Sequence, residues 1–178
     1  CQDKLQSLLQ PLTELSPIIA VVGQEEPTPA FDVCAALMSL PYLLNIHHID
    51  AIPNPVPYLG LIQTAEIPLR HTPAFKVGIV WAGNPSHEND RYRSTTLQQF
   101  RQLFDISDCQ FYSLQVGEAA NQIEPLLDRY PITNLAQSLN DFTETASVVA
   151  QLDLVISVDT SVAHLAGAMG KLVWTLLP

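Results

Sequence analysis

Two short polar segments hold the residues with the clearest chemical potential. The first, residues 83–94, contains Arg91 and Arg93, two of only eight basic residues in the chain. Guanidinium groups bind phosphate through paired hydrogen bonds, so this segment is suited to an anion. Ion pairs of these arginines with the neighbouring Glu88 and Asp90 in a solvated loop would account for them equally well.

The second segment is Asp-Thr-Ser-Val-Ala-His at residues 159–164, between an apolar run and a helical pattern. Backbone N–H groups at a helix start lack partners within the helix, and the helix dipole favours an anion there. The N–H groups of Ser161, Val162 and Ala163 are therefore expected to be free, with His164 pointing away from the sheet core. A bland interpretation stays open, because Asp and Thr are ordinary helix caps and an outward His is often only solvated.

The elements that would position these segments follow a regular alternation from residue 75 onward. Strands are predicted at residues 75–82, 109–116, 132–135, 153–158 and 172–177, and helices at residues 95–104, 118–129, 141–152 and 161–169. Asp141 and Glu144 have the spacing of a capping box at the start of the third helix. This alternation predicts an α/β fold, a Rossmann-like parallel sheet with flanking helices. Ligands of such sheets bind beyond the carboxyl ends of the strands, where both polar segments would lie.

The first part of the chain is less regular. Its pattern predicts a helix over residues 3–15 shortened by Pro11, a strand at 18–22, a possible strand at 31–34 and a short helix at 35–44 broken at Pro41. Three alternating prolines within residues 52–59 disfavour both helix and sheet. We expect three parts: residues 1–51, a proline-rich linker at 52–74 and a Rossmann-like domain at 75–178.

Charge and composition exclude several functions. The chain has 8 Lys and Arg against 18 Asp and Glu, a net charge of −10, which argues against nucleic acid or an anionic membrane as a partner. No apolar run approaches the roughly 18 residues of a transmembrane segment. Its three cysteines form no C-x-x-C pair, which favours a reducing, cytoplasmic location.

Two common kinds of site lack their motifs. No glycine-rich phosphate loop of the dinucleotide or P-loop type occurs in the sequence. His47 and His48 are adjacent, so their side chains point apart, and no acidic or sulfur partner follows at ligand spacing. We expect no metal site.

Four segments in fixed order carry a resemblance to a known family. They are Trp-Ala-Gly-Asn-Pro at residues 81–85, Asp-Arg-Tyr-Arg-Ser at 90–94, Leu-Val-Ile-Ser-Val-Asp-Thr-Ser-Val-Ala-His-Leu-Ala-Gly-Ala at 154–168 and Val-Trp-Thr-Leu-Leu-Pro at 173–178. The series resembles the donor-binding half of bacterial glycosyltransferases that follow tetratricopeptide repeats, relatives of the heptosyltransferases. The resemblance covers residues 76–178 and extends more weakly over residues 31–59.

The resemblance implies a GT-B architecture, in which two Rossmann-like domains face each other and the second binds a nucleotide-diphosphate sugar. This sugar nucleotide is a substrate, and no cofactor is implied. Residues 1–51 would be a remnant of the first domain. The donor-binding residues implied by the resemblance are Gly83, Asn84, Arg91, Arg93, Asp159, Thr160, Ser161 and His164. The implied reaction is inverting, metal-independent glycosyl transfer to a protein or glycan acceptor, with positive groups neutralising the leaving diphosphate.

The family's acidic group that activates the acceptor is expected in a Gly-Asp loop early in the first domain, and residues 1–22 contain no such loop. We therefore expect a truncated chain that binds a donor with little or no turnover and that lacks a final covering helix. Two alternatives stay open: a non-catalytic α/β interaction domain, and a nucleotide-sugar epimerase of the same architecture.

Overall fold

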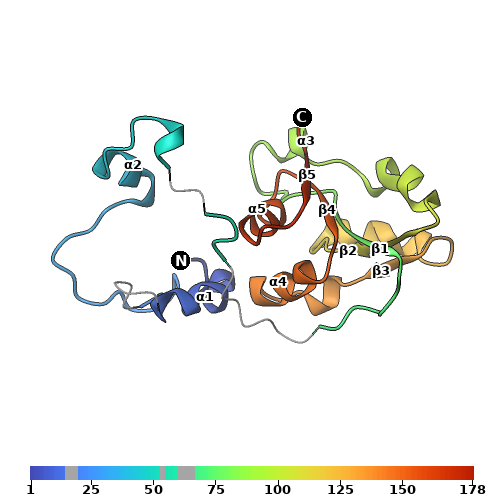
Figure 1. Cartoon of the computed structure of the whole chain (residues 1–178), viewed down its shortest axis with the longest axis horizontal. Helices are drawn as coiled ribbons and strands as arrows, with labels where there is room; N and C mark the ends of the chain where they lie inside the picture. The colour runs from blue at the N-terminus through green and yellow to red at the C-terminus, as the bar shows by residue number, and fades with distance from the viewer. Residues whose placement is uncertain (15–19, 53–54, 60–66) are drawn as a thin grey trace.

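The computed structural model describes residues 1–14, 20–52, 55–59 and 67–178 (Figure 1). Its centre is a sheet of five parallel strands in the order β3-β2-β1-β4-β5. The strands are β1 (Phe75–Val80), β2 (Cys109–Ser113), β3 (Ile132–Asn134), β4 (Leu154–Val158) and β5 (Val173–Leu176). This sheet with its flanking helices confirms the predicted α/β, Rossmann-like fold.

The strands β1 and β2 end earlier than the sequence predicts. The N–H groups of Trp81 and Ala82 bond to the side chain of Gln115, at 3.1 and 2.9 Å, and not to a neighbouring strand. Where β1 and β2 separate, the side chain of the buried Gln115 thus replaces the hydrogen bonds that a neighbouring strand would supply. At the centre of β1, a Cβ on Gly78 would lie 2.5 Å from Leu152 Cδ1, so glycine allows the covering side chains to approach the strand closely.

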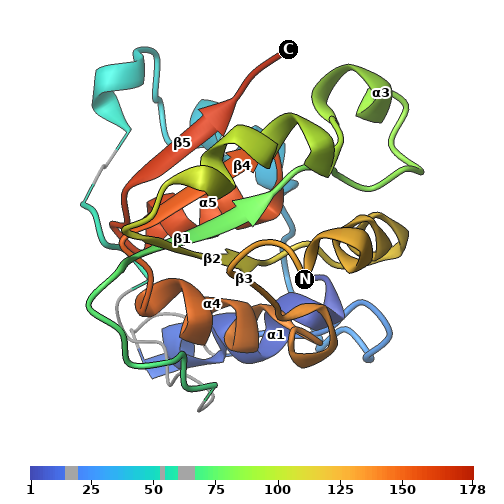
Figure 2. The same cartoon turned by 90° about the vertical axis from the view of Figure 1, so that its right-hand side faces the viewer.

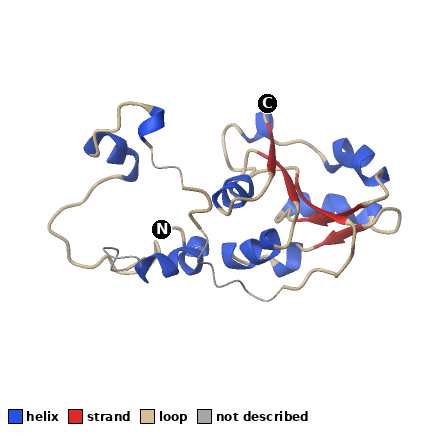
Figure 3. Ribbon diagram, in the orientation of Figure 1, coloured by secondary structure: helices blue, strands red, loops and turns tan. Residues whose placement is uncertain are grey.

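Helices cover both faces of the sheet (Figure 3). One face carries η4 (Leu97–Asp105) and η5 (Glu118–Leu126), whose buried side chains Phe100, Phe104 and Ile123 meet the strands. Both segments were predicted to be helical, but they are 3-10 rather than α-helices. In η5, Pro125 has no N–H to donate to an α-helical hydrogen bond.

The opposite face carries α4 (Phe142–Ala150) and α5 (Ser161–Ala168). The capping box predicted for α4 is confirmed, because the Asp141 carboxylate accepts hydrogen bonds from the N–H groups of Thr143 and Glu144 at 2.8 and 2.9 Å. The Glu144 carboxylate accepts the Asp141 N–H in return, at 3.3 Å. The amphipathic helices and the apolar strands therefore enclose one core on each side of the sheet.

The N-terminal helix α1 (Asp3–Leu9) lies beside α4 in both views (Figures 1 and 2). It gives way at Gln10 to the 3-10 segment η1 (Gln10–Glu14), the early end predicted from Pro11. The strand predicted at residues 18–22 falls partly outside the described residues, and its described part, 20–22, is not a strand. The Val22 carbonyl accepts a hydrogen bond from the Cys1 nitrogen at 2.6 Å.

Residues 31–51 form an arm that extends away from the sheet (Figure 1). It contains η2 (Leu37–Ser39), α2 (Leu40–Leu43) and η3 (Ile49–Ala51), and residues 31–34 form no strand. Pro41 does not break α2, contrary to the prediction, because it lies in the first turn, where its missing N–H has no helical partner to lose.

Parts of the predicted linker at residues 52–74 contact the helices. The N–H groups of Tyr58 and Leu59 bond to the Ala168 carbonyl at the end of α5. Gln151 in turn holds the backbone of Ile67 and Leu69 beside α4. None of the described helices combines the length and apolarity that crossing a bilayer requires.

Candidate functional site

The two polar segments meet in a pocket of about 540 Å³ at the carboxyl edge of the sheet. The chain runs from β1 toward β2 and β3 on one side, and β4 and β5 lie on the other, so this edge contains the topological switch point. We call this cavity the switch-point pocket. Five of the eight predicted donor-binding residues line it, namely Gly83, Asn84, Arg93, Thr160 and Ser161.

The loop after β1 is held by its own hydrogen bonds. Gly83 N–H donates to Ser94 Oγ at 2.8 Å, and Thr95 N–H donates to the Trp81 carbonyl at 2.8 Å. The short helix α3 (Asp90–Arg93) lies within this closed loop. A Cβ at Gly83 would lie 2.5 Å from Asp90 Oδ1 and 2.6 Å from Arg93 Nη2, so only glycine allows these two side chains to lie against the backbone.

Arg93 connects the two polar segments. Its Nε lies 3.1 Å from Asp90 Oδ1, and its Nη1 donates to the Asp159 carbonyl at 2.9 Å. Only 20% of the Arg93 side chain and 13% of the Asp90 side chain are exposed, so this is a largely buried ion pair. The ion pair considered from the sequence is therefore present, with Asp90 as the partner, and Arg93 also lines the pocket.

Arg91 does not line the switch-point pocket. Its Nη2 donates to the Tyr92 hydroxyl at 2.6 Å, and its guanidinium carbon lies 4.6 Å from the centre of the Tyr92 ring. Arg91 and Arg93 are separated by about 200° around a helix, which explains why α3 directs only one of them to the cavity.

The loop after β4 presents backbone donors to the pocket. Thr160 caps α5 with extended backbone, while its hydroxyl lies 2.9 Å from Ser157 Oγ and makes no cap hydrogen bond. The Ala163 N–H bonds to the Thr160 carbonyl at 3.1 Å, which corrects the expectation that this group is free. The N–H groups of Ser161 and Val162 have no partner among the described residues.

Asp159 and His164 pair with each other at the side of the pocket and do not line it. His164 Nε2 lies 3.4 Å from Asp159 Oδ1, with 80% of the His164 side chain and 49% of the Asp159 side chain exposed. This exposure confirms the predicted outward direction of His164. Both side chains are accessible to a molecule that extends beyond the switch-point pocket.

Gln115 is a component of the site that the sequence reasoning missed. Its Oε1 accepts the N–H groups of Trp81 and Ala82, and its Nε2 donates to the carbonyls of Ala82 and Val116 at 3.0 and 3.1 Å. The residue is only 3% exposed. The sequence signal for this role was an amide side chain just after an otherwise apolar strand. In the structure it joins the segments that follow β1 and β2.

Two ionisable groups outside the pocket have shifted pKa values. Burial raises the pKa of Tyr112, whose side chain belongs to the core under α4. The hydrogen bond to Tyr130 raises the pKa of Arg101 on η4. In the described part of the chain, no group of three or more His, Cys, Asp or Glu side chains is arranged to hold a metal ion.

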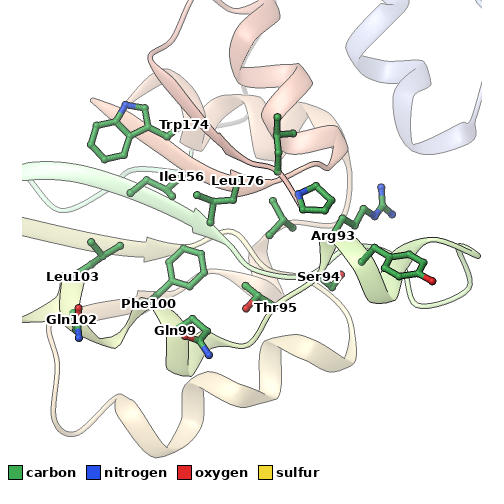
Figure 4. Close-up of a pocket in the computed structure, with 14 residues that line it drawn as sticks. Arg93, Ser94, Thr95, Gln99, Phe100, Gln102, Leu103, Ile156, Trp174 and Leu176 are labelled. Atoms are coloured by element: carbon green, nitrogen blue, oxygen red, sulfur yellow. The ribbon is translucent and has the colours of Figure 1, made fainter.

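A second pocket, of about 620 Å³, lies on the η4 side of the sheet (Figure 4). Its wall includes the apolar side chains of Phe100, Leu103, Ile156, Trp174 and Leu176. Although Arg93 reaches its edge, this pocket does not include the start of α5, which supplies free N–H groups. It is less suited to a diphosphate than the switch-point pocket.

Residues 113–177 match the model of glycosyltransferase family 9 (heptosyltransferase). The matched span runs from the end of β2 to β5 and contains the loop after β4, whereas the loop after β1 precedes it. Among curated proteins and solved structures, nothing matches the chain. The match supports a glycosyltransferase at the level of the family.

Proposed function

We propose that the switch-point pocket binds the diphosphate of a nucleotide-diphosphate sugar, and that the chain supplies the donor-binding part of a glycosyltransferase. The observation that carries this proposal is the convergence of Gly83, Asn84 and Arg93 with Thr160 and Ser161 around one cavity. The family match over residues 113–177 supports the reaction class.

The proposed chemistry follows from the groups around the cavity. The free N–H groups of Ser161 and Val162 and the dipole of α5 favour an anion at this position. Arg93, paired with Asp90, lines the other side of the cavity and holds the two loops together, while Asp159 and His164 are proposed to contact the donor next to the diphosphate. The free N–H groups and the helix dipole stabilise the negative charge that develops as the diphosphate leaves, so the proposed inverting transfer needs no metal ion.

Room for the rest of the donor exists beside the diphosphate position. An adjoining pocket of about 410 Å³ shares the Gly83 and Gly117 wall and continues toward Glu118 and Asn121. The nucleoside is proposed to occupy this extension. The described residues that line the switch-point pocket include no carboxylate, so we propose that this cavity binds the donor and does not activate the acceptor.

Calorimetric titration with UDP, GDP, ADP and CMP, and with the corresponding nucleosides, tests this proposal. Binding of one nucleotide at one hundred times its Kd would stabilise the fold by about 2.7 kcal/mol, which a thermal-shift measurement detects. Asp159→Ala and His164→Ala are expected to weaken that binding. Gln102→Ala, which alters the wall of the other pocket, serves as the matched control.

The outcomes separate the alternatives. A non-catalytic interaction domain predicts no nucleotide binding to the wild-type chain, a result that would contradict the proposal. An epimerase would convert the sugar nucleotide into an isomer of the same mass, whereas a glycosyltransferase would release the nucleoside diphosphate. Chromatography of nucleotide sugars after incubation with acceptor-containing extract distinguishes these products.

A further inference from the structure

The helix α1 forms part of the wall of the switch-point pocket. Gln2 and Lys4 line the cavity together with the loops that follow β1, β2 and β4. Figure 2 shows α1 below the sheet, next to α4, and the N-terminus near the carboxyl ends of the central strands. A segment remote in sequence from both polar loops thus reaches the same cavity.

Apolar contacts hold α1 in this place. Leu8 is 4% exposed and forms a cluster with the buried Ala146 of α4 and Leu165 of α5. Lys4 precedes Leu8 by one helical turn, so both residues lie on the same side of α1. The docking of Leu8 therefore directs Lys4 along the same face, toward the ends of α4 and α5.

The charges around the pocket distinguish Lys4 from Arg93. Arg93 is neutralised by Asp90 and donates a hydrogen bond to the Asp159 carbonyl. Lys4 has neither an ion pair nor a hydrogen bond to any described residue. Of the carboxylates nearby, Asp3 Oδ1 accepts the Gln24 N–H and Asp141 Oδ1 accepts the N–H groups that begin α4, and neither carboxylate forms an ion pair with Lys4 among the described residues.

Lys4 is also close to the free backbone donors. Together with Ser161 and Val162 it lines the switch-point pocket. The same three residues also line a small adjoining cavity of about 90 Å³, whose wall includes Asp141, the residue that caps α4. An ammonium group on a flexible side chain and two unpaired N–H groups thus border the same space. This combination suits an anion with several oxygen atoms, such as a diphosphate.

We infer that Lys4 is a donor-binding residue of the switch-point pocket, where its ammonium group pairs with the diphosphate. This inference rests on the proposed function. It assigns to α1 the available positive charge that the sequence resemblance placed on Arg91 or Arg93. Arg93 then has a second task, which is to hold the two polar loops together.

The test compares diphosphates with nucleosides in calorimetric titrations of UDP, GDP, ADP, uridine, guanosine and adenosine. Lys4→Ala is expected to weaken binding of a nucleoside diphosphate about five- to tenfold, the size of one charge-assisted contact, and to leave nucleoside binding unchanged. Lys4→Arg should restore most of the affinity. Lys76→Ala removes the same charge at the amino end of β1, far from the pocket, and should have no effect.

Three results would overturn the inference, and they differ in what else they overturn. If the wild-type chain binds diphosphates and Lys4→Ala binds them equally well, Lys4 has no such role while the proposed function stands. If Lys4→Ala weakens diphosphate and nucleoside binding alike, Lys4 supports the structure of the pocket and does not pair with the diphosphate. If the wild-type chain binds none of the three diphosphates, the proposed function and the inference both fail.

Discussion

The loops after β1 and β4 reach the same edge of the sheet but satisfy their polar groups in different ways. In the loop after β1, Gly83 bonds to Ser94 and Arg93 bonds to Asp90, so the loop is closed by its own side chains. In the loop after β4, the N–H groups of Ser161 and Val162 have no partner among the described residues.

This difference teaches that one loop sets the shape of the pocket and the other presents hydrogen-bond donors to it. Substitutions in the framework around the first loop should therefore reduce stability as well as binding. Substitutions around the second loop should reduce binding alone. The following predictions test that division.

Gln115→Ala should have the largest effect on stability. It removes four hydrogen bonds and leaves the buried N–H of Trp81 without a partner, which predicts a loss of about 2 to 4 kcal/mol in the free energy of unfolding. Urea denaturation measures this loss. Gln99→Ala, an exposed glutamine on η4, is the control and should change stability by less than about 0.5 kcal/mol. Equal stability of the two variants would refute the framework role.

Arg93→Ala should follow, with a loss of about 1 to 2 kcal/mol. The substitution removes the ion pair with Asp90 and the hydrogen bond to the Asp159 carbonyl, both largely buried. The matched control is Arg91→Ala, because within the described part of the chain the polar contacts of Arg91 are with its neighbour Tyr92. Thermal unfolding compares the two variants directly. An equal fall in Tm would show that the contacts of Arg93 contribute no more to stability than those of Arg91.

Gly83→Ala should cost about 1 kcal/mol and also weaken diphosphate binding. The new Cβ would lie 2.5 Å from Asp90 Oδ1 and 2.6 Å from Arg93 Nη2, so these flexible side-chain ends must move away to admit it. Gly167→Ala is the control, since a Cβ there meets nothing within 4 Å. If Gly83→Ala binds a diphosphate as tightly as the wild type, the position of the Asp90–Arg93 pair is not important for diphosphate binding.

His164→Ala should have the smallest effect on stability, within about 0.5 kcal/mol of the wild type, because the side chain is 80% exposed. The same variant should weaken nucleotide binding several-fold if His164 contacts the donor. His71→Ala, on another exposed part of the chain, should change neither property. If His164→Ala is destabilised but binds nucleotide normally, the loop after β4 contributes to stability and not to binding, contrary to the role assigned to it.

Much of the sheet could be predicted from the sequence, because alternating apolar runs and helical patterns are local signals. The capping box of α4 and the outward direction of His164 were predicted for the same reason. The strand expected at residues 18–22 was wrong in its described part, because residues 20–22 pair with no strand of the sheet. Apolar composition alone does not reveal whether a segment has a pairing partner.

The pocket was harder to predict than the sheet, because its lining depends on contacts between segments that are distant in the sequence. Sequence spacing placed Arg91 and Arg93 in one loop, but the turn of α3 brings only Arg93 to the cavity. Gln115 and Lys4 lie far from the recognised motif, and their roles arise from the divergence of β1 and β2 and from the docking of Leu8. Neither of these arrangements follows from the local pattern.

The central claim is that a diphosphate binds between the two loops, and amide NMR of the wild-type chain tests it most directly. On titration with UDP, GDP or ADP, the account predicts the largest shift changes at the N–H groups of Ser161 and Val162, with smaller ones at Gly83. The indole N–H of Trp174, in the apolar pocket, should stay unchanged. Changes centred on Trp174, or no changes with any of the three nucleotides, would contradict the account.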